Sequence, residues 1–142
     1  MSFEIVDLNP GPIDYVELQQ GPPGIQGPPG PPGGAGTATQ LNFAYGDATP
    51  ALIATVTANK NIMRIDVLVD TVFNGTNAAV TIGDAGDNDS VVSADQIDLT
   101  AVGTYQINPT KKYGSNTAVN LYITPGAGAS TGTGVLFFYV EV

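Results

Sequence analysis

Glycine occupies every third position from Gly21 to Gly36, and six of the chain's eleven prolines lie between those glycines. Three polyproline II strands can wind together only if glycine recurs every third residue, because a Cβ does not fit at the crowded axis. Proline at the intervening positions fixes φ near the required value and lowers the entropy cost of ordering. The repeat predicts a collagen triple helix, and hence a unit of three chains. A stiff proline-rich linker in a monomer is the alternative interpretation.

This collagen-like stalk covers residues 21–36, and at about 3.1 Å per residue it would form a rod of roughly 45 Å. A run this short is marginal alone, because few triplets must offset the entropy of joining three chains. We therefore expect a neighbouring segment that also holds the trimer together. The axial positions are Gly21, Gly24, Gly27, Gly30, Gly33 and Gly36.

Composition limits the function of the chain. The 142 residues allow one globular domain plus appendages, and the net charge is −9 with no histidine. This balance argues against a nucleic-acid-binding surface and against attraction to an anionic membrane. Cysteine is absent, which excludes a disulfide framework and a thiolate metal site. The first residues lack the basic start and apolar run of a signal peptide, so we expect the protein to be made and assembled in a cytoplasm.

Residues 1–20 form a distinct acidic arm without a compensating cation. Its charges are Glu4, Asp7, Asp14 and Glu17, and its interleaved apolar side chains are Phe3, Ile5, Val6, Leu8, Ile13, Tyr15, Val16 and Leu18. The sequence Asn9-Pro10-Gly11-Pro12 divides the arm into two short extended pieces. The arm could be a frayed terminus or a strand that adds to the sheet edge of a partner. The apolar density favours the partner-anchoring interpretation.

Residues 37–142 read as short strands separated by turn signals, which predicts an all-β head built as a jelly-roll-like sandwich. Residues Thr37 to Gln40 are expected to be a loop leading into this head. The expected strands are Leu41–Tyr45, Ala51–Ala58, Asn61–Thr71, Ala78–Ile82, Val91–Ser93 with Gln96–Leu99, Thr104–Ile107, Val119–Thr124 and Val135–Val142.

Two of these strands have informative side-chain patterns. In Asn61–Thr71 the alternation predicts one buried and one wet face. The buried face would carry Met63, Ile65, Val67 and Val69, and the wet face Arg64, Asp66 and Asp70, interrupted by Leu68. The last strand is apolar on both faces. Either it is a central strand of a single domain, or one face meets neighbouring chains near a threefold axis through Val135, Phe137, Phe138 and Tyr139.

Candidate chemistry is sparse. Asp87 and Asp89 have the alternate spacing of Ca²⁺ ligands, but the loop lacks the glycine and distal glutamate of an EF-hand, so a solvated acidic turn is favoured. Without His or Cys, the usual base and thiol nucleophile are missing, and we expect no enzyme activity and no cofactor. Sugar could stack on Tyr105, Tyr113 and Tyr122, although strand packing is favoured for these rings.

The order of parts resembles a known family type. An N-terminal anchor, the Gly21–Gly36 triplets and a small β head are similar to the collagen-like virion proteins of tailed bacteriophages, among them head fibres and capsid decoration proteins. The head, with Gly103-Thr104-Tyr105-Gln106-Ile107 and the apolar Val135–Val142, resembles trimeric jelly-roll heads of the C1q/TNF-like type. Bacterial spore-surface collagen-like glycoproteins share the plan but usually carry much longer collagen runs.

The resemblance implies a homotrimer attached through residues 1–20 to the major capsid protein or another virion shell protein, with its head projecting from the capsid surface. Two other functions are weighed against this one. The head could be the receptor- or glycan-binding tip of a tail fibre or spore filament, with a host-surface glycan as partner. An enzyme acting on surface polysaccharide would need a carboxylate pair in a cleft.

Overall fold

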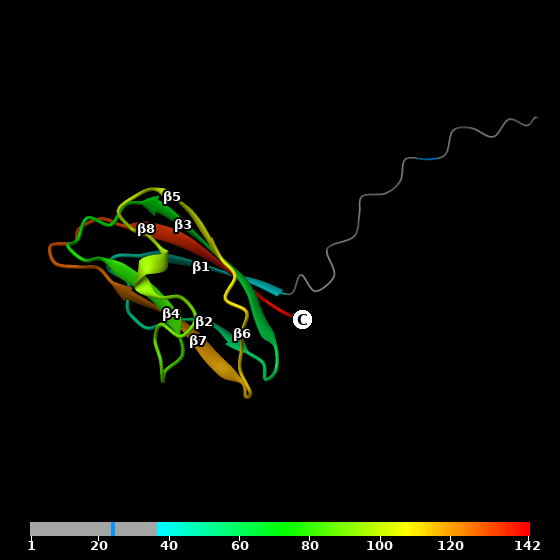
Figure 1. Ribbon diagram of the computed structural model, residues 1–142. Helices are drawn as coiled ribbons and strands as arrows, with labels where there is room; N and C mark the ends of the chain where they lie inside the picture. The colour runs from blue at the N-terminus through cyan, green and yellow to red at the C-terminus, as the bar shows by residue number, and fades with distance from the viewer. Residues whose placement is uncertain (1–23, 25–36) are drawn as a thin grey trace, which may run out of the picture. The chain divides into compact units, whose positions relative to one another are not determined.

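The computed structural model describes Gly24 and residues 37–142. Residues 37–142 form two facing antiparallel sheets (Figure 1). One three-residue 3₁₀ turn, η1 (Ala94–Gln96), is the only helical element in this part of the chain. No helix in it has the length and apolar character that a membrane crossing requires. The all-β prediction is confirmed.

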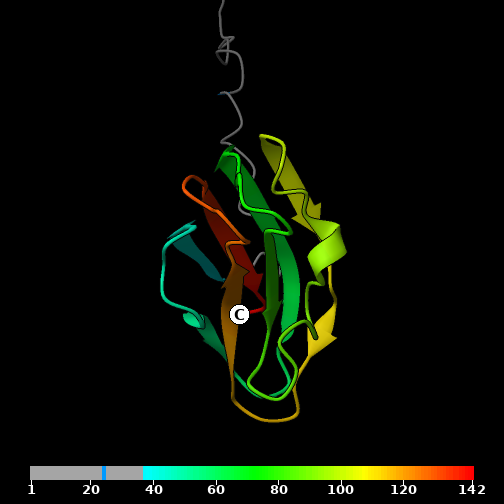
Figure 2. The ribbon, with the colours of Figure 1, turned by 90° about the vertical axis from the view of Figure 1, so that its left-hand side faces the viewer.

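The strands are shared unequally between the sheets. The five-stranded sheet runs β1 (Thr37–Ala44), β8 (Thr133–Val140), β3 (Asn61–Thr71) and β5 (Gly103–Ile107), with the short β6 (Lys111–Lys112) also paired to β3. The three-stranded sheet runs β2 (Ala51–Val56), β7 (Thr117–Thr124) and β4 (Ala79–Gly83). The first strand pairs with the last, and the second with the seventh, so the pairs are nested (Figure 2). The jelly-roll form of this sandwich stays a prediction.

The core lies between the two sheets and contains only apolar side chains among the described residues. Alternation along each strand directs every second residue inward. The five-stranded sheet contributes Phe43, Ile62, Ile65, Val67, Val69, Ile107, Leu136 and Phe138, and the other sheet contributes Ile53, Val56, Val80, Ile82, Val119, Leu121 and Ile123. Loop residues such as Phe73 and Leu99 close the ends.

Gly134 fixes how β8 fits against its neighbours. A Cβ at this inward position would lie 2.5 Å from the Phe43 ring and 2.7 Å from the main-chain oxygen of Leu68. Both distances are shorter than real Cβ contacts, so only glycine lets the Phe43 ring pack this closely. The same ring stacks at a tilt on Phe73, with 6.1 Å between centroids.

Two predictions about the first strands are wrong. Thr37 to Gln40 is not a loop, because β1 begins at Thr37 and pairs with β8 from its first residue. Met63 is not buried, since the pairing of β3 with β8 shifts between Ile62 and Arg64. This bulge places Ile62 in the core and leaves Met63 38% exposed, whereas Ile65, Val67 and Val69 are buried as predicted.

The predicted strand pieces at residues 91–93 and 96–99 are also wrong. Val92 makes a single bridge to Ile82, and the chain then turns through η1. The side-chain oxygen of Gln96 accepts a hydrogen bond from Ser93 N at 2.9 Å, which stabilises this turn locally. The two-residue strand β6 is not expected from the sequence, because Lys111 and Lys112 carry no apolar alternation.

We expect Phe138→Ala to lower the free energy of unfolding by about 3–5 kcal/mol, because the fully buried ring leaves a cavity that neighbouring strands cannot fill. Chemical denaturation of the full chain, followed by tyrosine fluorescence, measures the change. Leu52→Ala is the control, since Leu52 is 57% exposed and its loss should cost no more than about 0.5 kcal/mol. Equal losses in both variants would contradict the assigned strand faces.

Candidate functional site

The outer face of the five-stranded sheet is the most distinctive surface of the described residues. Its β8 and β3 side chains lie in cross-strand pairs, which are Arg64 with Tyr139, Asp66 with Phe137, and Leu68 with Val135. The apolar members, Leu68, Val135, Phe137 and Tyr139, are half-buried and adjacent, and we call them the apolar strip. An antiparallel sheet usually presents polar side chains to water on such a face.

A charged pair lies at one end of the apolar strip. Arg64 Nη2 is 3.1 Å from Asp66 Oδ2, and the Arg64 guanidinium carbon is 4.3 Å from the centroid of the Tyr139 ring. Contact with Tyr139 raises the pKa of Arg64 most, and the Asp66 carboxylate raises it further while desolvation opposes both. The guanidinium therefore makes a cation–π contact with the Tyr139 ring as well as an ion pair with Asp66.

This pair also contains two unsatisfied atoms. Arg64 Nε and Asp66 Oδ1 are buried and have no hydrogen-bond partner within the described chain. The Asp66 side chain is 18% exposed, so the sequence-based expectation of a wet face fails at this position. Buried polar atoms without partners cost stability and are few in folded proteins.

The structure divides the four predicted interface residues. Val135, Phe137 and Tyr139 point outward, while Phe138 points into the core and is fully buried. Alternation along β8 makes this division unavoidable, so Phe138 cannot contribute to an outer surface. Sequence reasoning misses Arg64, Asp66 and Leu68 as members of the same surface, because their pairing with β8 is set by long-range register.

The predicted arm and stalk residues lie outside the described residues, apart from Gly24. The anchoring predictions at Phe3, Ile5, Val6, Leu8, Ile13, Tyr15, Val16 and Leu18, and the axial glycines, therefore stay predictions.

The acidic loop after β4 is organised by Asp84. Its Oδ1 accepts hydrogen bonds from Gly86 N at 2.9 Å and Asp87 N at 3.1 Å, and its Oδ2 accepts one from Ser90 Oγ. These bonds, with that from Gly86 the largest cause, lower the pKa of Asp84. The loop is thus a self-capped turn.

The weak Ca²⁺ candidates sit at the exposed tip of this turn. Asp89 N donates a hydrogen bond to Asp87 Oδ1, and the nearby Asp87 carboxylate raises the pKa of Asp89. No group of three acidic, histidine or cysteine side chains suited to a metal occurs among the residues described. An exposed pair of this kind is also not enclosed in a cleft, as glycoside hydrolysis would require.

The hydroxyl groups of the three candidate sugar-stacking tyrosines form hydrogen bonds with loop residues. Tyr122 OH donates to the main-chain oxygen of Asp84, and Tyr105 OH donates to that of Asp98, both at 3.0 Å. Tyr113 OH is 3.4 Å from Ser90 Oγ, and its ring packs partly on the core. Strand packing with the hydroxyl at the rim therefore explains Tyr105 and Tyr122, while Tyr113 packs on the core from the loop after β6.

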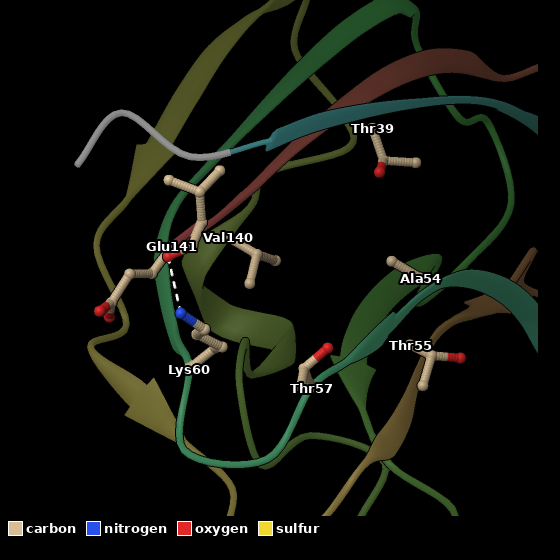
Figure 3. A pocket seen from close by; sticks show the side chains of 8 residues that line it. Thr39, Ala54, Thr55, Thr57, Lys60, Val140 and Glu141 are labelled. Atoms are coloured by element: carbon tan, nitrogen blue, oxygen red, sulfur yellow. Dashed lines mark hydrogen bonds between the residues drawn. The ribbon is translucent and has the colours of Figure 1, made fainter. Parts of the chain in front are cut away.

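A hollow of about 330 Å³ opens between β1, β2 and the last residues (Figure 3). It is lined by Thr39, Ala54, Thr55, Thr57, Lys60, Val140, Glu141 and Val142. Lys60 Nζ donates to the main-chain oxygen of Val142 at 2.7 Å, and Glu141 Oε1 accepts from Asn61. Its charged groups are already engaged, so the hollow offers no assembled catalytic or ligand-binding set.

Comparison with known proteins gives a fold but no family. The sequence matches no protein-family model and no curated protein. Solved structures do match. The head is similar in fold to chains of phage capsids. One is from the capsid asymmetric unit of cyanophage Pam1, with a TM-score of 0.57, 16% identity, and 90% of this chain and 97% of that chain covered.

A second similar chain comes from the acidic stable capsid of Helicobacter pylori bacteriophage KHP30. Its TM-score is 0.57 at 12% identity, with 75% of this chain and 86% of that chain covered. At such identities the likeness establishes a shared fold.

The Asp84 turn gives a pH-dependent prediction. The lowered pKa means that the Asp84 carboxylate contributes stability above the ordinary aspartate range, and this is lost as pH falls through the folded pKa. Asp84→Asn should therefore lower the denaturation midpoint at neutral pH and match the parent in acid. Tyr122→Phe is the control, because losing its bond to the Asp84 main chain should cost stability at both pH values. A pH-independent Asp84→Asn effect would contradict the assignment.

Proposed function

We propose that the protein is a structural component of a bacteriophage virion. The observation that carries the proposal is the fold shared with phage capsid chains, almost the whole of which is matched in one case. Fold alone does not determine function, so the proposal also relies on the collagen-like repeat and the arm.

More specifically, we propose that the protein is a homotrimeric decoration (cement) protein or head fibre on the capsid surface. The glycine repeat is the reason for proposing a trimer, because a triple helix needs three chains. The apolar and acidic arm supplies the anchor, adding extended segments to sheet edges of the major capsid protein or another shell protein. Three linked arms make weak individual contacts adequate.

A receptor- or glycan-binding tip is the second candidate function that the sequence suggests. Within the described chain, the tyrosines that suggest it bond to their own loops, which leaves this function without a supporting site.

Single substitutions in the collagen-like stalk test the proposed trimer. We expect Gly27→Ala to lower the thermal stability of the trimer, because one Cβ at the axis locally disrupts a triple helix that has few triplets. Gln26→Ala is the matched control, since the neighbouring position lies outside the axial frame. Sedimentation equilibrium at increasing temperature measures both variants. A full-length chain that sediments as a monomer at micromolar concentration contradicts the trimer.

The anchor is tested on particles that lack the protein. Deleting residues 2–18 should leave a trimer that no longer co-sediments with them, because its apolar and backbone contacts are gone. Replacing Phe3, Ile5 and Leu8 by Ser should have the same effect. As a matched control, Glu4→Gln with Asp7→Asn keeps the apolar side chains and should retain binding. Decoration that survives the deletion refutes the anchor.

A further inference from the structure

We propose that residues 1–20 contain two copies of one docking segment, so that each chain binds two equivalent sites on neighbouring subunits of the shell. This inference rests on the proposed anchoring by the arm and goes beyond it, because an anchor needs only one contact. The partner is a protein that presents the same strand-accepting edge at short intervals, as a shell of identical subunits does.

The sequence of the arm repeats after ten residues. Copy 1 (residues 3–8) and copy 2 (residues 13–18) both have an apolar residue first, an acid second, two apolar residues next, an acid fifth and leucine last. Each acid is exchanged only for the other acid, so the charge is kept although the side-chain length changes. The corresponding residues are Phe3 and Ile13, Glu4 and Asp14, Ile5 and Tyr15, Val6 and Val16, Asp7 and Glu17, and Leu8 and Leu18.

The residues that follow each copy also correspond. Asn9 is matched by Gln19, and Gly11-Pro12 is matched by Gly21-Pro22, where the collagen-like stalk begins. Glycine weakens a strand and proline removes the main-chain donor that a strand needs, so both end strand pairing. Each copy is therefore a separate unit with the length of an ordinary strand, and the two copies are not halves of one long strand.

The described head shows how the same pattern folds elsewhere in this chain. Ile65-Asp66-Val67-Leu68 in β3 has the order of apolar and acidic residues found in the first four positions of each copy. This stretch is extended and paired on both sides, with Ile65 and Val67 buried and Asp66 directed to the opposite face. The same alternation directs the first and third side chains of each copy into an apolar surface of the partner, with the carboxylate between them pointing away.

Two docking segments on one chain need two separate sites. A sheet edge accepts one added strand, so both copies bind only where two equal edges lie within reach. Ten residues span at most about 35 Å, and the two edges must be at least this close. Neighbouring subunits of a shell meet this condition. Because each contact is tethered to the others, contacts that are weak singly act together.

The chain's own head is the alternative occupant, and the predicted stalk argues against it. Residues 13–20 span less than about 29 Å even when fully extended. A stalk of roughly 45 Å is longer than this, so copy 2 would not reach the head of its own trimer.

The test is made with the full chain on particles that lack the protein. Copy 1 is given the sequence of copy 2 by four substitutions, which are Phe3→Ile, Glu4→Asp, Ile5→Tyr and Asp7→Glu. We expect the protein concentration at half-saturation of the particles to stay within about threefold of the parent value, because both copies fit the same site. An increase of tenfold or more would show that copy 1 has a site of its own and would overturn the inference.

Exchanges that keep the composition of each copy are the matched controls. Glu4→Ile with Ile5→Glu moves a carboxylate onto the apolar face of copy 1 and should raise the half-saturating concentration roughly tenfold or more. Asp14→Tyr with Tyr15→Asp makes the same change in copy 2 and should have an effect of the same size. An effect in one copy alone would overturn the inference, because the copies would then not be equivalent.

Two further results separate this inference from the proposed function. A parent protein that does not bind the particles would refute the anchor and the inference together. If the parent binds but either exchange alters the sedimentation of the free protein, the copies make contacts within the protein itself. That result would overturn the inference and leave the virion role standing.

Discussion

Antiparallel pairing of β8 on both of its sides is the interaction on which the rest of the head depends. Its alternation sends Leu136 and Phe138 into the core and Val135, Phe137 and Tyr139 outward. A shift of one residue would exchange these faces, so the register must be fixed strongly. Gly134 contributes to this, because only its lack of a Cβ accommodates the Phe43 ring and the Leu68 main chain. The same register therefore determines which β8 side chains enter the core and which form the candidate interface.

Sequence patterns predict the elements whose stability is local or whose alternation is unbroken. The strand Asn61–Thr71 is predicted with its bounds, because its period of two is visible along the chain. The same pattern places Met63 on the wrong face, since a bulge depends on the partner strand and leaves no mark in the sequence. Thr37 to Gln40 resembles a loop for the same reason: polar residues join β1 only because β8 is there to pair with them.

The sequence predicts only part of the candidate surface on the outer face of the five-stranded sheet. The apolar character of the last strand indicates an interface, but the pattern cannot exclude Phe138 until its face is known. Arg64 and Asp66 look like solvated charges in the sequence, yet Phe137 and Tyr139, far along the chain, bury part of them. Likewise, the loops that the tyrosines hold cannot be read from spacing, because Tyr122 reaches Asp84 across 38 positions. Long-range contacts are what the sequence leaves undetermined.

In the proposed trimer, stalk and heads each supply what the other lacks. Five triplets offer little to offset the entropy of joining three chains, but they align the chains and fix where each β1 begins. In that trimer, tethering by the stalk would turn contact between heads into an intramolecular step at high effective concentration. Either part alone would be weak. Their direct junction at Gly36 and Thr37 is what lets the two weak contacts act together, and a flexible insertion there would uncouple them.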